Sequence, residues 1–268
     1  MLTTMTMPDN PTAAIIIIGD EILSGRTIDT NVNTIAKFLA ALGVDLMEVR
    51  MVHDIEAQIV EAVNALRAAY SYVFTTGGIG PTHDDITADC IAAAFGVAIG
   101  EHPEALALLE DRARRMGYEL NVNSRRMARI PDTASLIKNP VSAAPGFQIG
   151  NVFVMAGVPK IMTAMLDDVA PRLTTGRRTL SRTVKLVYVG ESWAADVLRD
   201  IDARFPDVSL GSYPYGLIQG EFGTHLVLRG QNEDSLNEAV RALKSALEPI
   251  VADGRTRNAL AAMEEIAA

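Results

Sequence analysis

The sequence predicts an α/β fold in which a mostly parallel sheet is covered by helices, followed by a small α+β domain. Apolar runs rich in β-branched residues alternate with segments of helical spacing over the first part of the chain. Strands separated by helices are joined by crossovers, so neighbouring strands run parallel. After residue 178 the order of the elements changes, and this change predicts the second domain.

The first domain is expected to cover residues 12–174. Its first strand, 13–18, is a continuous apolar run, which is typical of a strand buried on both faces. Gly43 and Gly117 lie where two helices should end, and Pro159 suits the first turn of another. The remaining expected elements are strands at 46–52, 72–74 and 151–155, and helices at 31–42, 55–69, 86–95, 103–116 and 159–173.

The second domain is expected to cover residues 179–252, after a short polar stretch at 174–178. Its expected elements are strands at 183–189, 208–213 and 225–229, and helices at 194–205 and 233–251. This β-α-β-β-α order is that of a small α+β domain. The tail, 253–268, is expected to be helical or frayed, and the first ten residues to form a loose arm.

The composition narrows the class of protein. The 268 residues carry a formal net charge of −9, and 49% of them are hydrophobic. This balance is that of an ordinary globular protein and argues against a general nucleic-acid or anionic-membrane surface. The single cysteine, Cys90, excludes an intrachain disulfide and a cysteine-based zinc site. The longest apolar run is too short to span a membrane, so we expect a cytoplasmic protein.

A glycine-rich segment predicts a phosphate site. Residues 77–87 read GGIGPTHDDIT and lie between a strand and a helix. Such a turn presents backbone N–H groups beside the positive end of a helix dipole, which favours an anion. Asp84 and Asp85 in the same turn would repel that anion unless a divalent cation lay between them. The segment therefore predicts a metal-assisted phosphate or pyrophosphate site.

Polar residues also follow the other predicted parallel strands, and the carboxyl ends of such strands form the ligand-binding edge of a sheet. Asp20, Glu21 and Asp84 offer the hard oxygen ligands that divalent metal ions prefer. Asp54 or His83 is suited to orient or deprotonate a water molecule. The residues expected to contact the phosphate-bearing ligand are Gly77, Gly78, Gly80, Gly157, Asn31 and Thr82.

Each of these residues also has a structural interpretation. Asp54 and Asp85 are good helix N-caps, and His83 suits an exposed loop. Asp20 and Glu21 suit a solvated turn, and the three glycines at 77–80 could serve only to shape one. Cys90 is expected to be a small core residue. Arg125, Arg126 and Arg129 could clamp phosphate or form a solvated basic face.

The motifs resemble the amino-terminal region of competence/damage-inducible protein A (CinA), within the MoaB/MogA-like superfamily of molybdenum-cofactor biosynthesis domains. The matching strings, from residue 13 to about 173, are Gly19–Gly25, Thr30–Asn31, Gly77–Thr87, Asn139–Pro140, Ala144–Phe147 and Gly157–Pro159. Two positions depart from the family pattern. Ser142-Ala143 stands where Gly-Thr is usual, and Ala156 where Pro is usual. Both lie in ligand-side loops, so they bear on substrate preference.

The resemblance implies a three-layer α/β domain that binds phosphate-bearing pterins or nucleotides. It implies that Asp85 and Asp54 are catalytic, because they match the aspartates that matter in molybdopterin-handling relatives. Related domains resemble metal-dependent pyrophosphatases that act on ADP-ribose or FAD. The second domain resembles the small domain that follows in CinA proteins, and its element order is KH-like. The carboxy-terminal deamidase domain of longer relatives, and its activity, are expected to be absent.

Two functions are therefore predicted. The first is hydrolysis of an ADP-ribose-like pyrophosphate with Mg²⁺, Mn²⁺ or Co²⁺. The second is binding or adenylylation of molybdopterin without hydrolysis. A KH-type nucleic-acid role is disfavoured, because Gly220–Gly223 lies between two predicted strands and its Glu221 would repel phosphate. The second domain is expected to mediate homodimerisation.

Overall fold

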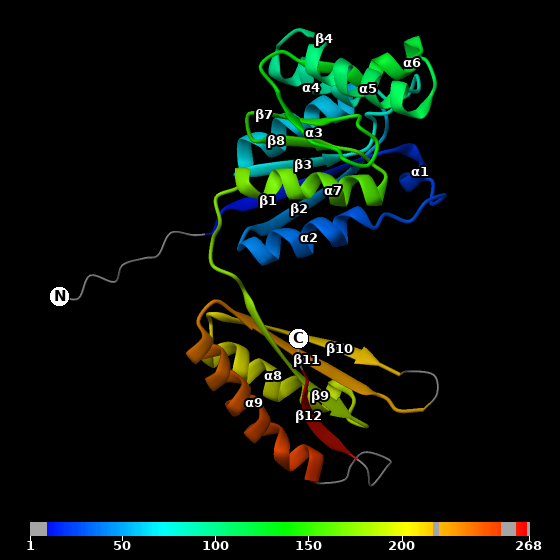
Figure 1. Cartoon of the computed structure of the whole chain (residues 1–268). Coiled ribbons are helices and arrows are strands. Elements are labelled where there is room, and N and C mark those ends of the chain that lie inside the picture. Colours follow the sequence, from blue (N-terminus) through cyan, green and yellow to red (C-terminus); the bar gives the residue numbers. More distant parts are fainter. Residues whose placement is uncertain (1–9, 217–219, 253–260, 267–268) are drawn as a thin grey trace, which may run out of the picture. The chain divides into compact units, whose positions relative to one another are not determined.

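The computed structural model describes residues 10–216, 220–252 and 261–266, which form two compact units that divide between Arg177 and Arg178 (Figure 1). The first unit contains a six-stranded sheet in the order β2-β1-β3-β8-β7-β6. Its strands are β1 (Thr12–Ile18), β2 (Asp45–Val52), β3 (Tyr72–Thr76), β6 (Ser135–Ile137), β7 (Gly146–Ile149) and β8 (Val152–Met155). The strands β2, β1, β3 and β8 are parallel, whereas β7 and β6 are antiparallel, so the sheet is mixed but mostly parallel, as predicted.

Helices cover both faces of this sheet, which gives the predicted three layers. One face packs against α2 (Asn31–Leu42) and α7 (Pro159–Val169), whose buried residues include Leu39 and Met162. The other packs against α3 (Glu56–Ala69), α4 (Thr87–Phe95) and α5 (Pro103–Met116). Successive residues of β1 enter alternate cores because neighbouring side chains of a strand point to opposite faces. Burial on both faces explains the continuous apolar run of β1.

The long periodic elements agree with the prediction, and the short ones were missed. Helices α2 and α5 have the predicted bounds. The missed elements are α1 (Asp20–Leu23), β4 (Ile99–Glu101), α6 (Val122–Arg125), β5 (Arg129–Pro131), the antiparallel strands β6 and β7, and a turn of 3-10 helix at Arg126–Ala128. The helix predicted at 159–173 ends as α7 at Val169 and continues as a turn of 3-10 helix at Ala170–Arg172. Elements of three or four residues are too short to show a hydrophobic period, so only pairing in the folded chain defines them.

The second unit is a four-stranded antiparallel sheet in the order β10-β11-β9-β12, packed on two helices. Its elements are β9 (Leu180–Val187), α8 (Glu191–Arg204), β10 (Val208–Tyr215), β11 (Gly223–Gly230), α9 (Glu233–Ala252) and β12 (Ala262–Ile266). The expectation of a helical or frayed tail was wrong for 262–266, because this segment pairs with β9 and adds a strand to the sheet. Residues 253–260 and 267–268 lie outside the described residues.

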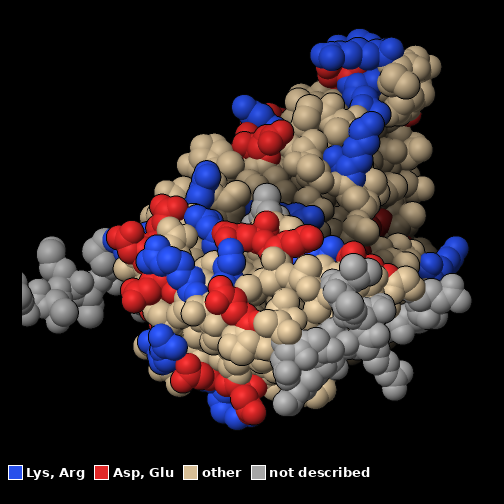
Figure 2. All heavy atoms as spheres, turned by 90° about the horizontal axis from the view of Figure 1, so that it is seen from below, with Lys and Arg blue, Asp and Glu red and all other residues tan. Residues whose placement is uncertain are grey.

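Acidic and basic side chains are interspersed on the face of the molecule that Figure 2 shows. The second unit carries ion pairs between Arg199 and Asp196, between Arg204 and Asp200, and between Lys244 and Glu265. This mixed pattern differs from the continuous basic face that attracts a nucleic-acid backbone. Within the described part of the chain, no helix is long and apolar enough to cross a membrane.

Candidate functional site

The loops that follow β1, β3 and β8 meet at one edge of the first unit's sheet and surround a cavity of about 550 Å³, which we call the main cavity. Parallel strands place their carboxyl ends at the same edge, so residues far apart in the chain become neighbours. A segment from Asn139 to Ala144, outside the parallel strands, closes one side. The residues that line the main cavity include Glu21, Thr27, Gly77, Gly78, Gly80, Asp85, Met127, Asn139, Ser142, Gly157 and Ile161.

The glycine-rich turn requires glycine at its first two positions. Gly77 and Gly78 have φ angles of +105° and +65°, which favour glycine. A Cβ atom on Gly77 would lie 2.0 Å from the Ile18 carbonyl oxygen, and one on Gly78 would lie 2.1 Å from the Thr87 hydroxyl. That hydroxyl donates to the Gly77 carbonyl at 3.0 Å, which ties the turn to the start of α4.

The turn offers fewer backbone donors than the sequence suggested. The Gly77 N–H donates to the Met155 carbonyl at 3.3 Å, so this N–H already has an acceptor within the protein, and contact of Gly77 with a phosphate stays a prediction. The N–H groups of Gly78 and Gly80 have no acceptor among residues 10–216, 220–252 and 261–266. These two amides remain the candidates for a phosphate oxygen.

The Asp85 side chain forms hydrogen bonds within the glycine-rich turn. Its Oδ2 accepts a hydrogen bond from the Thr82 N–H at 2.8 Å and another from the Thr82 hydroxyl. Helix α4 begins at Thr87, and Ile86 stands at its N-cap without a side-chain bond. The interpretation of Asp85 as a helix cap was therefore wrong, because its carboxylate is committed to Thr82. Both Thr82 donors bond to Asp85, so Thr82 supports the turn, and its contact with a ligand stays a prediction.

Asp54 is also not a helix cap. Helix α3 begins at Glu56 with Ile55 at its N-cap, whereas Asp54 Oδ2 accepts from the Asp20 N–H at 3.0 Å. This bond joins the ends of β1 and β2. Burial raises the pKa of the Asp54 carboxyl above its ordinary value. The hydrogen bond from the Asp20 N–H lowers that pKa, whereas the negative charges of Asp20, Glu21 and Asp84 raise it.

The three predicted metal ligands occupy different surroundings. Asp20 Oδ1 lies 2.7 Å from His53 Nδ1, Glu21 lines the main cavity, and the exposed Asp84 lies on the far part of the turn. Within the described residues, no three histidine, cysteine or acidic side chains converge closely enough to hold a metal ion. Asp20 turns toward His53, so the three are not gathered into one cluster. Metal binding by these residues stays a prediction.

Asn31 lines a small cavity next to the main one, together with Glu21, Gly77 and Gly157. Its side chain is 3% exposed, and its Nδ2 donates to the Gly157 carbonyl at 2.7 Å. Asn31 thereby holds the turn after β8 against the start of α2. The sequence analysis predicts that Asn31 and Gly157 lie near the ligand, and the structure shows that they contact each other.

The three candidate arginines differ in the groups that they contact. Arg125 forms two hydrogen bonds with Glu101, at 3.0 and 2.7 Å, and Arg129 forms two with Asp89. Arg126 instead donates to the Asp85 carbonyl at 3.4 Å and lines a small cavity beside Gly78 and Gly80.

The His83 side chain is 99% exposed. Cys90 is buried, which raises the pKa of its thiol to about 12, as expected of a core residue.

Asn139 is a site residue that sequence reasoning missed. Its Nδ2 donates to Ser142 Oγ and to the Ala144 carbonyl, and its Oδ1 accepts from the N–H groups of Val141 and Ser142, both at 3.0 Å. These bonds fold the 139–144 segment into the wall of the main cavity. The Asn-Pro pair at 139–140 was the available signal, because Asn side chains commonly bond to the backbone that follows them.

Comparisons with known protein families divide the chain as the structure does. Residues 14–175 match the family described as the probable molybdopterin binding domain. Residues 178–254 match the family described as the middle domain of FAD synthase. The first match contains every residue that lines the main cavity.

Similar proteins include a CinA-like protein of Desulforapulum autotrophicum, 34% identical over 248 residues, and a probable FAD synthase of Caenorhabditis elegans, 31% identical over 270 residues. The alignments cover 87% and 92% of this chain, but only 59% and 52% of those proteins. The chain therefore spans little more than half the length of these two relatives.

A solved structure, that of CinA from Thermoplasma acidophilum, is similar with a TM-score of 0.57 and 32% sequence identity. It covers 62% of this chain and 99% of its own. The CinA-like resemblance carried by the sequence motifs is thereby confirmed.

Proposed function

This chain belongs to the family of the probable molybdopterin-binding domain, and on that premise we propose that its first unit hydrolyses an ADP-ribose-like pyrophosphate with the help of a divalent metal ion. The observation that carries the proposal is the main cavity, where a phosphate-type glycine turn meets the carboxylates of Glu21 and Asp85. Its volume of about 550 Å³ suits a nucleotide-sized ligand.

The phosphate groups would contact the turn. The N–H groups of Gly78 and Gly80 offer donors that need no side chain, and Arg126 adds positive charge beside them. Asp85 holds the turn in this shape through Thr82. A rigid set of donors lowers the cost of placing the pyrophosphate for attack.

A divalent ion fits the carboxylates even though they do not form a closed cluster. Mg²⁺ is commonly held by one or two carboxylates together with the phosphates of the substrate. Glu21 lines the cavity, and the charges of Asp20, Glu21 and Asp84 all raise the pKa of Asp54, so these three remain the proposed ligands for Mg²⁺, Mn²⁺ or Co²⁺. When bound, the ion would neutralise phosphate charge and make a bound water more acidic.

Asp54 is the proposed general base. Burial raises the pKa of the Asp54 carboxyl, which makes its carboxylate a better proton acceptor than that of an ordinary aspartate. Water would lose a proton to Asp54 as its oxygen attacks one phosphorus atom. The P–O–P bond breaks, and AMP and ribose 5-phosphate leave.

The test is incubation of the purified chain with ADP-ribose and each metal ion, with AMP release measured by chromatography. We expect AMP with at least one metal and none after chelation. Asp54→Asn and Asp85→Asn should be strongly impaired, whereas Asp132→Asn, an exposed aspartate at the turn between β5 and β6, should match the unaltered protein. No AMP release with any of the three metals would contradict the proposal.

A second candidate is a protein that holds molybdopterin or its adenylylated form without hydrolysis. The family description favours it, and the same cavity would serve. Calorimetry with molybdopterin and with its adenylylated form separates the two. Tight pterin binding without AMP release from ADP-ribose would favour this candidate, and absence of binding by either compound would eliminate it.

A further inference from the structure

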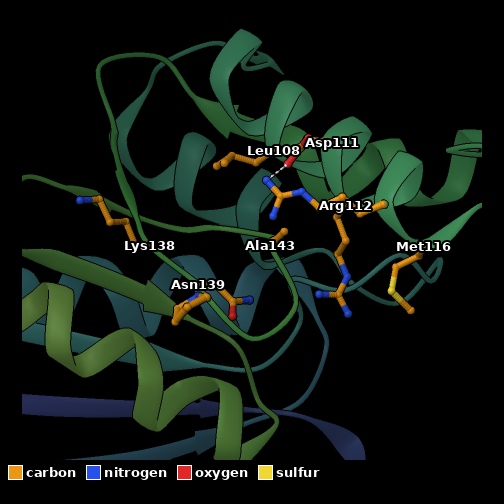
Figure 3. A pocket seen from close by; sticks show the side chains of 9 residues that line it. Leu108, Asp111, Arg112, Met116, Lys138, Asn139 and Ala143 are labelled. Carbon is orange, nitrogen blue, oxygen red and sulfur yellow. Dashed lines mark ion pairs between the residues drawn. The ribbon is translucent and has the colours of Figure 1, made fainter.

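A second cavity, of about 400 Å³, lies between the C-terminal half of α5 and the segment Lys138–Ala143 (Figure 3). We call it the basic cavity. Figure 3 shows Leu108, Arg112 and Met116 projecting from α5, and Asn139 and Ala143 on the facing segment. Asn139 lines both the basic cavity and the main cavity, so the 139–144 segment is a wall that the two cavities share.

This wall is held in a specific shape. Arg112 Nη1 donates to the Val141 carbonyl at 2.8 Å, which anchors the wall to α5. Ala143 adopts a φ angle of +63°, a left-handed conformation that is unfavourable for any residue with a Cβ atom. Such conformations persist where the surroundings enforce them, and they concentrate at ligand sites.

The chemistry of the basic cavity suits an anion with an organic part. Arg112, Arg115 and Lys138 carry three positive charges, and Asp111, the partner of Arg115, carries the one negative charge in the lining. The lining also includes the partly exposed apolar side chains of Leu108 and Met116. An inorganic anion alone would leave these apolar surfaces in contact with water.

We propose that the basic cavity binds a phosphate monoester of nucleoside size, with its phosphate at Arg115 and Lys138 and its organic part against Leu108 and Met116. Asn139 lines both cavities, so this second ligand site shares a wall with the main cavity. The affinity of the basic cavity for a phosphate monoester does not depend on the proposed function.

The test uses AMP as the probe, with Arg115→Gln and Arg114→Gln as a matched pair. Both arginines are 77% exposed and both lie near Asp111, but only Arg115 lines the basic cavity. Loss of a charge-assisted hydrogen bond should weaken AMP binding about tenfold in Arg115→Gln. Arg114→Gln should bind like the unaltered protein. Lys138→Gln is a second, independent variant and should also weaken binding.

Calorimetry with AMP, adenosine and inorganic phosphate gives the affinities, and thermal melting checks that each variant is folded. AMP should bind more tightly than adenosine or phosphate alone. Equal affinities in Arg115→Gln and Arg114→Gln, whether both unchanged or both reduced, would overturn the proposal. Since no turnover is needed, AMP binding that depends on Arg115 without hydrolysis of ADP-ribose would uphold this site and reject the pyrophosphatase.

Discussion

Asp54 shows how one carboxylate can be costly for stability and useful for function. It joins the ends of β1 and β2 through the Asp20 N–H, and burial and neighbouring carboxylates disfavour its ionised form. A carboxyl group whose pKa is raised in the folded state stabilises the fold below its unfolded pKa. That stabilisation is lost as the pH rises through the folded pKa, so ionisation of Asp54 destabilises the protein.

Asp54→Asn should therefore lower activity and raise stability. The amide oxygen can still accept from the Asp20 N–H, while the charge is removed. We expect kcat for AMP release to fall about 100-fold or more, the usual effect of removing a general base. The melting temperature at pH 7 should rise, and the gain should vanish in acid, where Asp54 is already neutral. A lower melting temperature at pH 7 would show that ionised Asp54 is stabilising.

The glycine turn gives a second prediction at the residue scale. Gly78 and Gly96 have the same φ angle of +65°, but a Cβ atom would clash with Thr87 only at Gly78. Gly96→Ala should cost about 1–2 kcal/mol of unfolding free energy, from the left-handed backbone alone. Gly78→Ala should cost more and should also abolish ligand binding. Urea denaturation measures both, and equal costs would mean that Thr87 moves away freely.

At the scale of elements, the joint between β3 and α4 holds the candidate site in shape. The buried Thr87 hydroxyl donates to the Gly77 carbonyl, and this hydrogen bond connects the start of the helix to the turn. The nearby Thr75, on β3, is buried as well, yet its hydroxyl has no hydrogen-bond partner within the described residues. The two threonines therefore form a natural comparison.

Thr87→Val should destabilise the protein by about 1–3 kcal/mol, because it leaves the buried Gly77 carbonyl without its donor. Thr75→Val should be nearly neutral or stabilising, because an unpaired hydroxyl is replaced by a methyl group of similar size. Equilibrium unfolding of both variants checks this. A destabilised Thr75→Val would indicate a partner for that hydroxyl.

Long periodic elements were predictable, and the reason is local. The bounds of α2 and α5 follow from their apolar spacing and from Gly43 and Gly117 beyond their ends. The antiparallel strands β6 and β7 were not predictable, because three or four residues carry no period. Their place in the sheet depends on partners in β8 and in each other. The same limit explains why the wall around Asn139 was missed.

At the scale of the whole molecule, the two units have separate hydrophobic cores, and the residues lining both cavities belong to the first. We therefore expect residues 1–177, expressed alone, to fold and to release AMP with a kcat/KM close to that of the whole chain. Circular dichroism and the AMP assay test this. A folded but inactive fragment would show that the second unit completes the site.

Homodimerisation through the second unit stays a prediction. It implies that light scattering at micromolar concentration should give a dimer for the whole chain and a monomer for residues 1–177. A monomeric whole chain, or a dimeric fragment, would contradict it.

The sequence by itself determined the layered α/β fold, the edge where the ligand loops gather and the CinA-like family, because hydrophobic periods and short motifs are properties of neighbouring residues. Only the tertiary structure decided what each polar group does there. Asp54 bonds to Asp20 instead of capping α3, the Gly77 N–H is taken by Met155, and Asn139 builds a wall between two cavities. A polar group forms its hydrogen bond with a group that lies close to it in space. For groups distant along the chain, the fold determines which of them come close.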